Sequence, residues 1–233
     1  MSVYTRIIMQ GDWQHPIAEV VKQALEYSVS KQALPAHINF IDGMSGKHYR
    51  EFINKLVKTT SNARYLEIGS WAGSTACAAL YNNNLKLTCV DNWSEFGGPK
   101  DVFFKNINNN KNNNTDFTFI EDDFRSIDYS NIGKFNIYLF DGPHDYEDQY
   151  EGVMIADEAL DDEYVLIVDD FNWSKVRKGT FDGIRDLGHK VISSIEIRTT
   201  EDDSHPQLSG KNSNWHNGYF IAVISKNLVE SSD

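Results

Sequence analysis

The sequence contains few cysteines and no long apolar run. Only Cys77 and Cys89 occur in 233 residues. Two thiols are too few for a disulfide framework or a metal knuckle, so we interpret both as buried core residues. No apolar run approaches the roughly 20 residues that a membrane span needs, and the N-terminal residues lack the apolar segment of a signal peptide. We therefore expect a soluble, cytoplasmic protein with no membrane partner.

Basic residues are also scarce. The chain has 22 Lys and Arg against 34 Asp and Glu, a formal net charge of −12 and a pI of about 5.0. Such a surface repels polyanions, and no cluster of Lys and Arg interleaved with aromatic residues compensates for it. We therefore exclude nucleic acid as a substrate. With 40% hydrophobic residues, the length suits a single domain with one sizeable core.

From residue 64 onward, short β-rich apolar runs alternate with segments of helical character. This alternation predicts βαβ units and an α/β fold with a mostly parallel, doubly wound sheet. The link between the last two runs, 199–218, looks like a loop, which permits an antiparallel last strand. Seven strands are predicted, at residues 64–69, 85–91, 117–121, 135–141, 164–170, 190–198 and 219–225.

The N-terminal part, residues 1–63, is predicted to be helical. Residues 15–32 and 46–60 each place apolar side chains near i, i+3 and i+4 spacing. We expect 1–63 to form a cap within the same domain as a core at 64–233, and the stretch 43–52 to contribute a lid.

The most specific local motif is "YLEIGSWAGST" at residues 65–75, in which a strand runs into Glu67-x-Gly69-x-x-x-Gly73 and then a helix start. Glycines are needed where a backbone turns tightly beside a ligand, and the helix N-terminus offers unpaired N–H groups. The G-x-G-x-x-G loop of dinucleotide-binding proteins is absent. The next strand ends at Asp91, where doubly wound folds place an acid that binds ribose hydroxyls; a solvated strand-end aspartate is the alternative.

Two further strands end in carboxylates. Asp141 ends the strand "FNIYLFD", and Asp169 and Asp170 end "YVLIVDD". Three neighbouring carboxylates repel one another unless a cation lies between them, and their hard oxygen atoms suit Mg²⁺ or Ca²⁺. His144 follows Asp141 by three residues and can serve as a base, because histidine has a reference pKa of about 6.5. Its alternative role is that of a hydrogen-bonding turn residue.

The Glu67 to Gly73 motif resembles motif I of the class I S-adenosylmethionine-dependent methyltransferases. The seven-strand order with a terminal hairpin is also the layout of that family's Rossmann-like fold. The resemblance implies that the loop receives the methionine part of the cofactor, that Asp91 binds the ribose, and that Asp123, or alternatively Asp122, takes the adenine amino group. The implied cofactor-binding residues are Glu67, Gly69, Ser70, Trp71, Gly73, Ser74, Asp91, Asn92, Trp93, Asp122, Asp123, Phe124 and Asp141.

The carboxylate cluster resembles that of the metal-dependent O-methyltransferases of the catechol, caffeoyl-coenzyme A and macrocin types. By that resemblance Asp141, Asp169 and Asp170 bind a metal, expected to be Mg²⁺, and His144 acts with Asp141 in catalysis as the general base. Asp170 stands where catechol-type enzymes usually have an amide, and His144 where they have lysine. Both departures favour the macrocin-like branch. The expected acceptor is thus a small-molecule hydroxyl on a sugar, a polyketide or other natural product, or a phenol.

Three competing interpretations remain. A nicotinamide oxidoreductase would share the fold but needs the missing glycine motif and leaves the strand-end aspartates unexplained. A non-catalytic S-adenosylmethionine-binding module would bind the cofactor without transfer. A metal-independent methyltransferase would use the acids to bind an amine. Related enzymes often pair, so a homodimer is also allowed, although no residue pattern fixes an interface.

Overall fold

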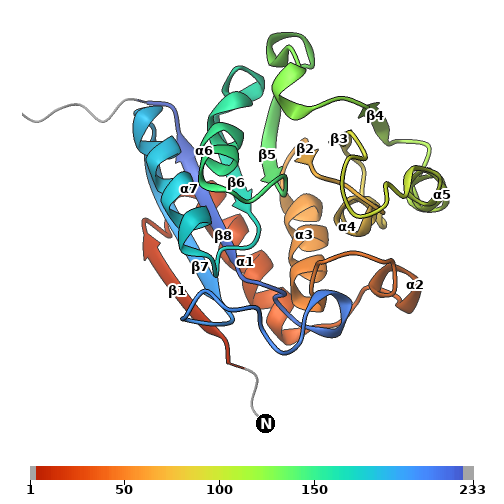
Figure 1. The fold of residues 1–233 in the computed structure, drawn as a ribbon, viewed down its shortest axis with the longest axis horizontal. Coiled ribbons are helices and arrows are strands. Elements are labelled where there is room, and N and C mark those ends of the chain that lie inside the picture. Colours follow the sequence, from red (N-terminus) through yellow and green to blue (C-terminus); the bar gives the residue numbers. More distant parts are fainter. Residues whose placement is uncertain (1–3, 228–233) are drawn as a thin grey trace, which may run out of the picture.

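One mixed sheet runs through the protein in the computed structural model, which describes residues 4–227 (Figure 1). Its eight strands within these residues lie in the order β1-β7-β8-β6-β5-β2-β3-β4. Strands β2 to β6 are parallel to one another, and β8 runs antiparallel between β6 and β7. The strands are β1 (Arg6–Gly11), β2 (Arg64–Ile68), β3 (Lys86–Val90), β4 (Asp116–Ile120), β5 (Phe135–Phe140), β6 (Leu160–Val168), β7 (Lys190–Arg198) and β8 (Tyr219–Ser225).

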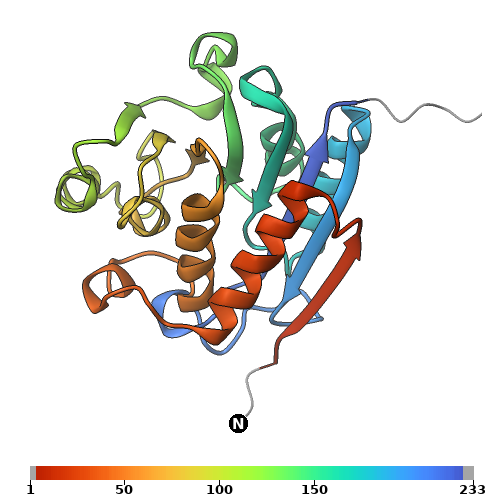
Figure 2. The ribbon, with the colours of Figure 1, turned by 180° about the vertical axis from the view of Figure 1, so that it is seen from behind.

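Helices cover both faces of this sheet. They are α1 (Pro16–Ser30), α2 (Ala36–Asn39), α3 (Lys47–Thr59), α4 (Ser74–Leu80), α5 (Lys100–Asn110), α6 (Tyr146–Ile155) and α7 (Ser174–Asp186). Helices α6 and α7 lie on the face seen in Figure 1, whereas α1 and α3 lie on the opposite face seen in Figure 2. The central strands read as continuous apolar runs because side chains on both of their faces are buried.

The two buried clusters follow the alternation of side chains along each strand. Tyr65 and Ile137 point to the side of α1, α3 and α4, while Leu66 and Tyr138 point to the side of α6 and α7. Phe52 of α3 belongs to the same cluster as Tyr65. Residues of the N-terminal region and of the sheet therefore share one core.

The prediction of the doubly wound α/β fold is confirmed, with an antiparallel last strand, but the number of strands was one too low. Strand β1 pairs antiparallel with β7, from Arg6 opposite Arg198 to Gly11 opposite Ser193. It was missed because "RIIMQG" is short, mostly exposed and paired only with a strand near the other end of the chain. Residues 1–63 are thus not wholly helical, although α1 and α3 lie where helices were expected.

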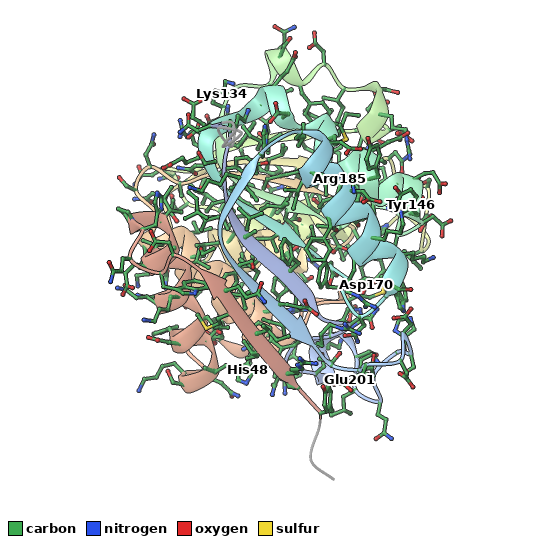
Figure 3. The ribbon with its side chains drawn as sticks, turned by 90° about the vertical axis from the view of Figure 1, so that its left-hand side faces the viewer. His48, Lys134, Tyr146, Asp170, Arg185 and Glu201 are labelled. Atoms are coloured by element: carbon green, nitrogen blue, oxygen red, sulfur yellow. The ribbon has the colours of Figure 1, made fainter. Side chains whose placement is uncertain are left out.

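The carboxyl ends of the parallel strands face one end of the molecule. In Figure 3, Lys134, just before β5, lies near the top, and Asp170, just after β6, lies well below it, so the parallel strands run from the side of Lys134 toward the side of Asp170. The helix expected between β4 and β5 consists of two 3-10 helices, Phe124–Ser126 and Tyr129–Asn131. No helix within the described residues is both long and apolar enough to cross a bilayer.

Candidate active site

A cavity of about 530 Å³ opens at the carboxyl ends of the parallel strands. Residues that follow five strands, β2 to β6, line it, as expected for ligand sites of doubly wound sheets. Of the residues singled out from the sequence, the lining includes Gly69, Ser70, Trp71, Ser74, Asp91, Asn92, Asp122, Asp123, Phe124, Asp141, His144, Asp169 and Asp170. Glu67, Gly73 and Trp93 lie outside the lining.

The loop between β2 and α4 depends on two glycines with positive φ. Gly69 has φ +86°, and a Cβ added there would lie 1.9 Å from the carbonyl oxygen of Asp141. Gly73 has φ +81° and lies against the ring of Phe103, so it allows α4 to pack beside α5 instead of touching the cavity. Gly69 thus lets the loop between β2 and α4 approach the end of β5 closely.

Glu67 lies beneath this loop and is fully buried. The Tyr65 hydroxyl donates a hydrogen bond to Glu67 Oε2 at 2.7 Å. Burial raises the pKa of Glu67 from 4.5 to about 7, and the hydrogen bond from Tyr65 offsets only part of this shift. Glu67 lies within β2 and is buried on the same face as Tyr65, whereas Gly69 and Ser70 follow the end of the strand and line the cavity.

Replacing Glu67 by glutamine is expected to flatten the pH dependence of stability. As the pH rises, Glu67 loses its proton at a lower pH in the unfolded chain than in the folded protein. The free energy of unfolding therefore falls between about pH 4.5 and about pH 7. This one group accounts for a loss of about 3 kcal/mol at 1.36 kcal/mol per pKa unit. Urea unfolding of the cofactor-free proteins across this range measures it, and equal losses in the wild type and Glu67→Gln would refute the assignment.

Asp91 holds two loops at the end of β3. Its Oδ2 accepts from the Trp71 N–H and its Oδ1 accepts from the Trp93 N–H, both at 2.8 Å. Each carboxylate oxygen keeps a further lone pair for a ligand hydroxyl. The Trp93 ring stacks on Phe119 with centroids 5.3 Å apart, so it packs into the core rather than against the cavity.

Three predicted residues follow β4. Asp123 Oδ1 accepts from the Arg125 N–H at 2.9 Å and caps a 3-10 helix, while Asp122 Oδ1 accepts from the Asp123 N–H at 2.8 Å. Phe124 is buried edge-on against Phe140, with centroids 5.4 Å apart. Both aspartates therefore shape the turn as well as lining the cavity.

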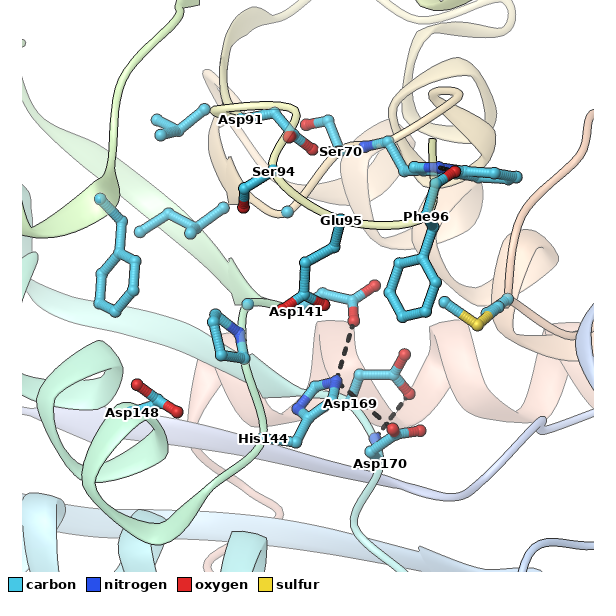
Figure 4. A pocket seen from close by; sticks show the side chains of 18 of the residues that line it. Ser70, Asp91, Ser94, Glu95, Phe96, Asp141, His144, Asp148, Asp169 and Asp170 are labelled. Atoms are coloured by element: carbon cyan, nitrogen blue, oxygen red, sulfur yellow. Dashed lines mark hydrogen bonds and ion pairs between the residues drawn. The ribbon is translucent and has the colours of Figure 1, made fainter. Parts of the chain in front are cut away.

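Asp141 follows β5, and Asp169 and Asp170 follow β6, so the three carboxylates line the same cavity (Figure 4). Among the described residues, however, the ligand atoms that lie within 4.8 Å of one another belong to Asp169, Asp170 and His216, and Asp141 is outside this group. Burial raises the pKa of both Asp141 and Asp169 well above the ordinary range, and the neighbouring carboxylates raise them further. Asp170 has φ +55°, which is uncommon outside glycine, and its N–H donates to Asp169 Oδ1 at 2.7 Å. A set of oxygen donors with this repulsion fits a divalent cation.

His144 lies beside this cluster. Its Nε2 is 3.3 Å from Asp170 Oδ2 and 3.6 Å from Asp141 Oδ1 (Figure 4). Its ring meets Trp173 edge-on with centroids 5.8 Å apart. The structure thus brings together His144 and the carboxylates that the sequence placed on two separate strands.

Two histidines that sequence reasoning left without a role also line the cavity. His216 Nε2 is 3.5 Å from Asp170 Oδ1, and His205 packs edge-on against Trp173 at 5.0 Å. Both come from the 199–218 loop, which carries no motif. Only the folded path of that loop shows that they reach the site.

Part of the N-terminal region reaches the cavity as well. Gly43 and Met44 line it, and the Ser45 and Ser74 hydroxyls are 2.9 Å apart. Buried Arg50 donates from Nε to Ser45 Oγ at 2.9 Å and from Nη1 to three backbone carbonyls of residues 38–41. Arg50 therefore fixes the segment before α3 against the first turn of α4.

Comparisons with known proteins find methyltransferases of the same fold. Residues 66–171 match a family model described as a methyltransferase domain. No curated protein matches the chain. Solved structures with the same fold include an O-methyltransferase from Bacillus cereus in complex with SAH, which is 14% identical with a TM-score of 0.54 over 89% of this chain and 91% of that one. SAH-bound Podospora anserina methyltransferase PaMTH1 is 11% identical, with a TM-score of 0.53 over 88% and 87%.

A third similar structure is TrmN from Thermus thermophilus, at 10% identity and a TM-score of 0.51. The match covers 76% of this chain but only 48% of TrmN, so this chain spans about half of that protein's length. The fold is that of the class I methyltransferases, and the family match, which covers a little under half of the chain, is to a methyltransferase domain. Because 433 solved chains match, the fold alone does not define the acceptor.

Proposed function

We propose that this protein is an S-adenosylmethionine-dependent O-methyltransferase that methylates a hydroxyl of a small molecule with the help of a divalent metal, Mg²⁺. The observation that carries the proposal is the shared cavity. The glycine loop, Asp91 and Asp123 line the same space as His144 and the aspartate pair Asp169 and Asp170. A cofactor and an acceptor can therefore meet there without any large movement of the sheet.

The cofactor half of the cavity would hold S-adenosylmethionine, which supplies an electrophilic methyl group when bound. The loop from Gly69 to Ser74 offers backbone N–H groups for its methionine end. Asp91 offers carboxylate oxygens to the ribose hydroxyls, and Asp123 or Asp122 offers one to the adenine amino group. Phe124, which is buried, lines the same region.

The other half has the donors for a metal. Asp141, Asp169 and Asp170 would hold Mg²⁺, which when bound supplies positive charge that lowers the pKa of a hydroxyl. Burial, and after it repulsion from the neighbouring carboxylates, raises the pKa of Asp141 and Asp169, and a cation would relieve that repulsion.

His144 is the proposed general base. Acting as a base requires a lone pair on Nε2 and a proton on Nδ1. Once Nε2 takes the hydroxyl proton, Asp170 Oδ2 at 3.3 Å and Asp141 Oδ1 at 3.6 Å stabilise the imidazolium. The Trp173 ring packs against His144 and limits its rotation. Holding the base and acceptor in place is the main contribution of these residues.

The charge of the cavity supports a small, non-polyanionic acceptor. Lys175 is the single lysine or arginine in the described lining, and it pairs with Asp145 at 2.6 Å. Against it stand nine acids, Asp91, Glu95, Asp122, Asp123, Asp141, Asp145, Asp148, Asp169 and Asp170. A nucleic acid backbone would be repelled at this surface.

The proposal is tested by calorimetric titration with S-adenosylhomocysteine, with Mg²⁺ and with a chelator, followed by transfer assays on sugars, polyketides and phenols. We expect stoichiometric binding of S-adenosylhomocysteine and Mg²⁺-dependent transfer to at least one hydroxyl. Folded protein that binds no S-adenosylhomocysteine would refute the methyltransferase assignment. Binding without any transfer would favour a non-catalytic module.

Replacing Asp169 by alanine is expected to abolish the stimulation by Mg²⁺ together with activity, because the site loses one of its three carboxylates. The measurement is the transfer rate as a function of Mg²⁺ concentration. Asp182→Ala is a suitable control, because Asp182 pairs with Lys178 and Arg185 on α7, outside the cavity lining. An Asp169→Ala enzyme stimulated normally by Mg²⁺ would eliminate Asp169 as a ligand, and wild-type activity that survives chelation would favour the metal-independent alternative.

A further inference from the structure

His216 is held firmly within the 199–218 loop. Its side chain is 4% exposed, and its backbone has φ +42°. The His216 N–H donates to Ser213 Oγ at 2.9 Å, and its carbonyl accepts from the Thr199 hydroxyl at 2.8 Å. Asn172, two residues after Asp170, in turn donates from Nδ2 to Thr199 Oγ1 at 2.8 Å. The loop is thereby tied to the segment that follows β6.

The hydrogen bond to Nδ1 fixes the tautomer of His216. The Gly210 N–H donates to His216 Nδ1 at 2.9 Å, so Nδ1 must carry a lone pair. In a neutral imidazole the proton then resides on Nε2. This nitrogen is the one that faces Asp170 Oδ1 at 3.5 Å.

A metal-ligand role for His216 conflicts with this arrangement. The candidate ligand atoms of Asp169, Asp170 and His216 do lie within 4.8 Å of one another. Ligation through Nε2, however, would require the ring proton to be on Nδ1. Two hydrogen-bond donors, Nδ1–H and the Gly210 N–H, would then face each other. Histidines that bind metals instead donate their other N–H to an acceptor.

The Asp170 side chain needs a neighbouring donor to fix its orientation. It is about nine-tenths buried, and its backbone holds φ +55°. Its Oδ1 accepts no hydrogen bond among residues 4–227, and the contact with His216 Nε2 at 3.5 Å is at ion-pair distance only. Oδ2, in contrast, faces His144 at 3.3 Å. A donor on the Oδ1 side would keep Oδ2 turned toward His144 and the cavity.

We propose that His216 is a positioning residue, which presents its Nε2–H to Asp170 Oδ1 and orients that carboxylate without binding the metal. The 199–218 loop thus sets the geometry of the carboxylate cluster through one histidine. The effect on metal binding and transfer rests on the proposed function, whereas the tautomer and the contact with Asp170 do not.

The first test is long-range ¹H–¹⁵N NMR of the full chain labelled at histidine nitrogens. We expect the His216 signals to show a neutral ring with its proton on Nε2, and to keep that tautomer when Mg²⁺ is added. A proton on Nδ1, or loss of the Nε2 proton on addition of Mg²⁺, would overturn the proposal. This result is decisive whether or not the protein transfers methyl groups.

Two substitutions test the effect on the site. His216→Leu removes the donor and is expected to weaken Mg²⁺ binding, measured by calorimetry, and to slow transfer, each by about tenfold, the lower end for residues that orient metal ligands. His216→Gln places an N–H₂ near the position of Nε2 and should recover most of both. Both variants carry the same strain at φ +42°, so a purely structural role would affect them alike.

His205→Leu serves as the matched control. His205 lines the same cavity from the same loop, but among the described residues it has no carboxylate partner. Its substitution should leave Mg²⁺ affinity unchanged. If His216→Leu and His205→Leu lower the Mg²⁺ affinity equally, or if His216→Gln recovers none of it, His216 does not position Asp170. A wild type that binds no Mg²⁺ would refute the metal in the proposed function, and the tautomer would still decide the role of His216.

Discussion

Replacing His144 by alanine is expected to lower the rate of methyl transfer by about 10²-fold or more, the scale at which general bases contribute. The variant loses Nε2, which lies 3.3 Å from Asp170 Oδ2 and 3.6 Å from Asp141 Oδ1. Among the described residues, no other side chain forms an ion pair with both carboxylates. The measurement is the single-turnover rate with saturating cofactor and an acceptor found in the screen.

The affinity for the cofactor distinguishes the loss of a general base from a general disruption of the fold. His144 lies beside the carboxylates, whereas the contacts proposed for the cofactor come from the glycine loop, Asp91 and the turn after β4. Titration with S-adenosylhomocysteine should therefore give nearly the wild-type affinity for His144→Ala. An unchanged transfer rate would remove His144 from the mechanism and leave it as a turn residue. A lowered melting temperature with a normal rate would point the same way.

Much of the sheet could be predicted because its strands are marked by local patterns. The run at β5 and the second half of β6, residues 164–168, are apolar on both faces, and each is followed by an aspartate where the strand ends. Strand β1 carries no such mark. Its side chains are mostly exposed, and it forms by pairing with β7, a contact that local sequence does not encode.

The candidate site was predictable to the extent that its residues follow strands. Asp91, Asp141 and Asp169 could be placed together because the carboxyl ends of parallel strands share one edge. His216 could not be placed this way, because it reaches Asp170 from an irregular loop whose path depends on side-chain hydrogen bonds. The burial of Glu67 could not be predicted either, because a motif at the end of a strand does not show which of its side chains points into the core.

Replacing Gly69 by alanine is expected to damage both stability and activity. A side chain at φ +86° costs about 1–2 kcal/mol, and a Cβ placed 1.9 Å from the Asp141 carbonyl oxygen forces a backbone shift that costs roughly another 1–3 kcal/mol. The shift would move the cofactor loop away from the end of β5. Displacement on this scale lowers transfer rates by about 10²-fold, and we expect the affinity for S-adenosylhomocysteine to fall with it.

Gly97→Ala provides a matched control for this experiment. Gly97 has φ +80°, close to that of Gly69, but an added Cβ would meet no heavy atom of the described residues within 4 Å. It should therefore carry only the conformational cost, a fall in melting temperature of roughly 2–4 °C per kcal/mol for a domain of this size. Gly69→Ala should melt at a lower temperature than Gly97→Ala, and the difference should equal the cost of the clash with the Asp141 carbonyl oxygen. If the two variants melt together and bind S-adenosylhomocysteine equally, the close approach of the loop to Asp141 does not hold the cofactor site in place.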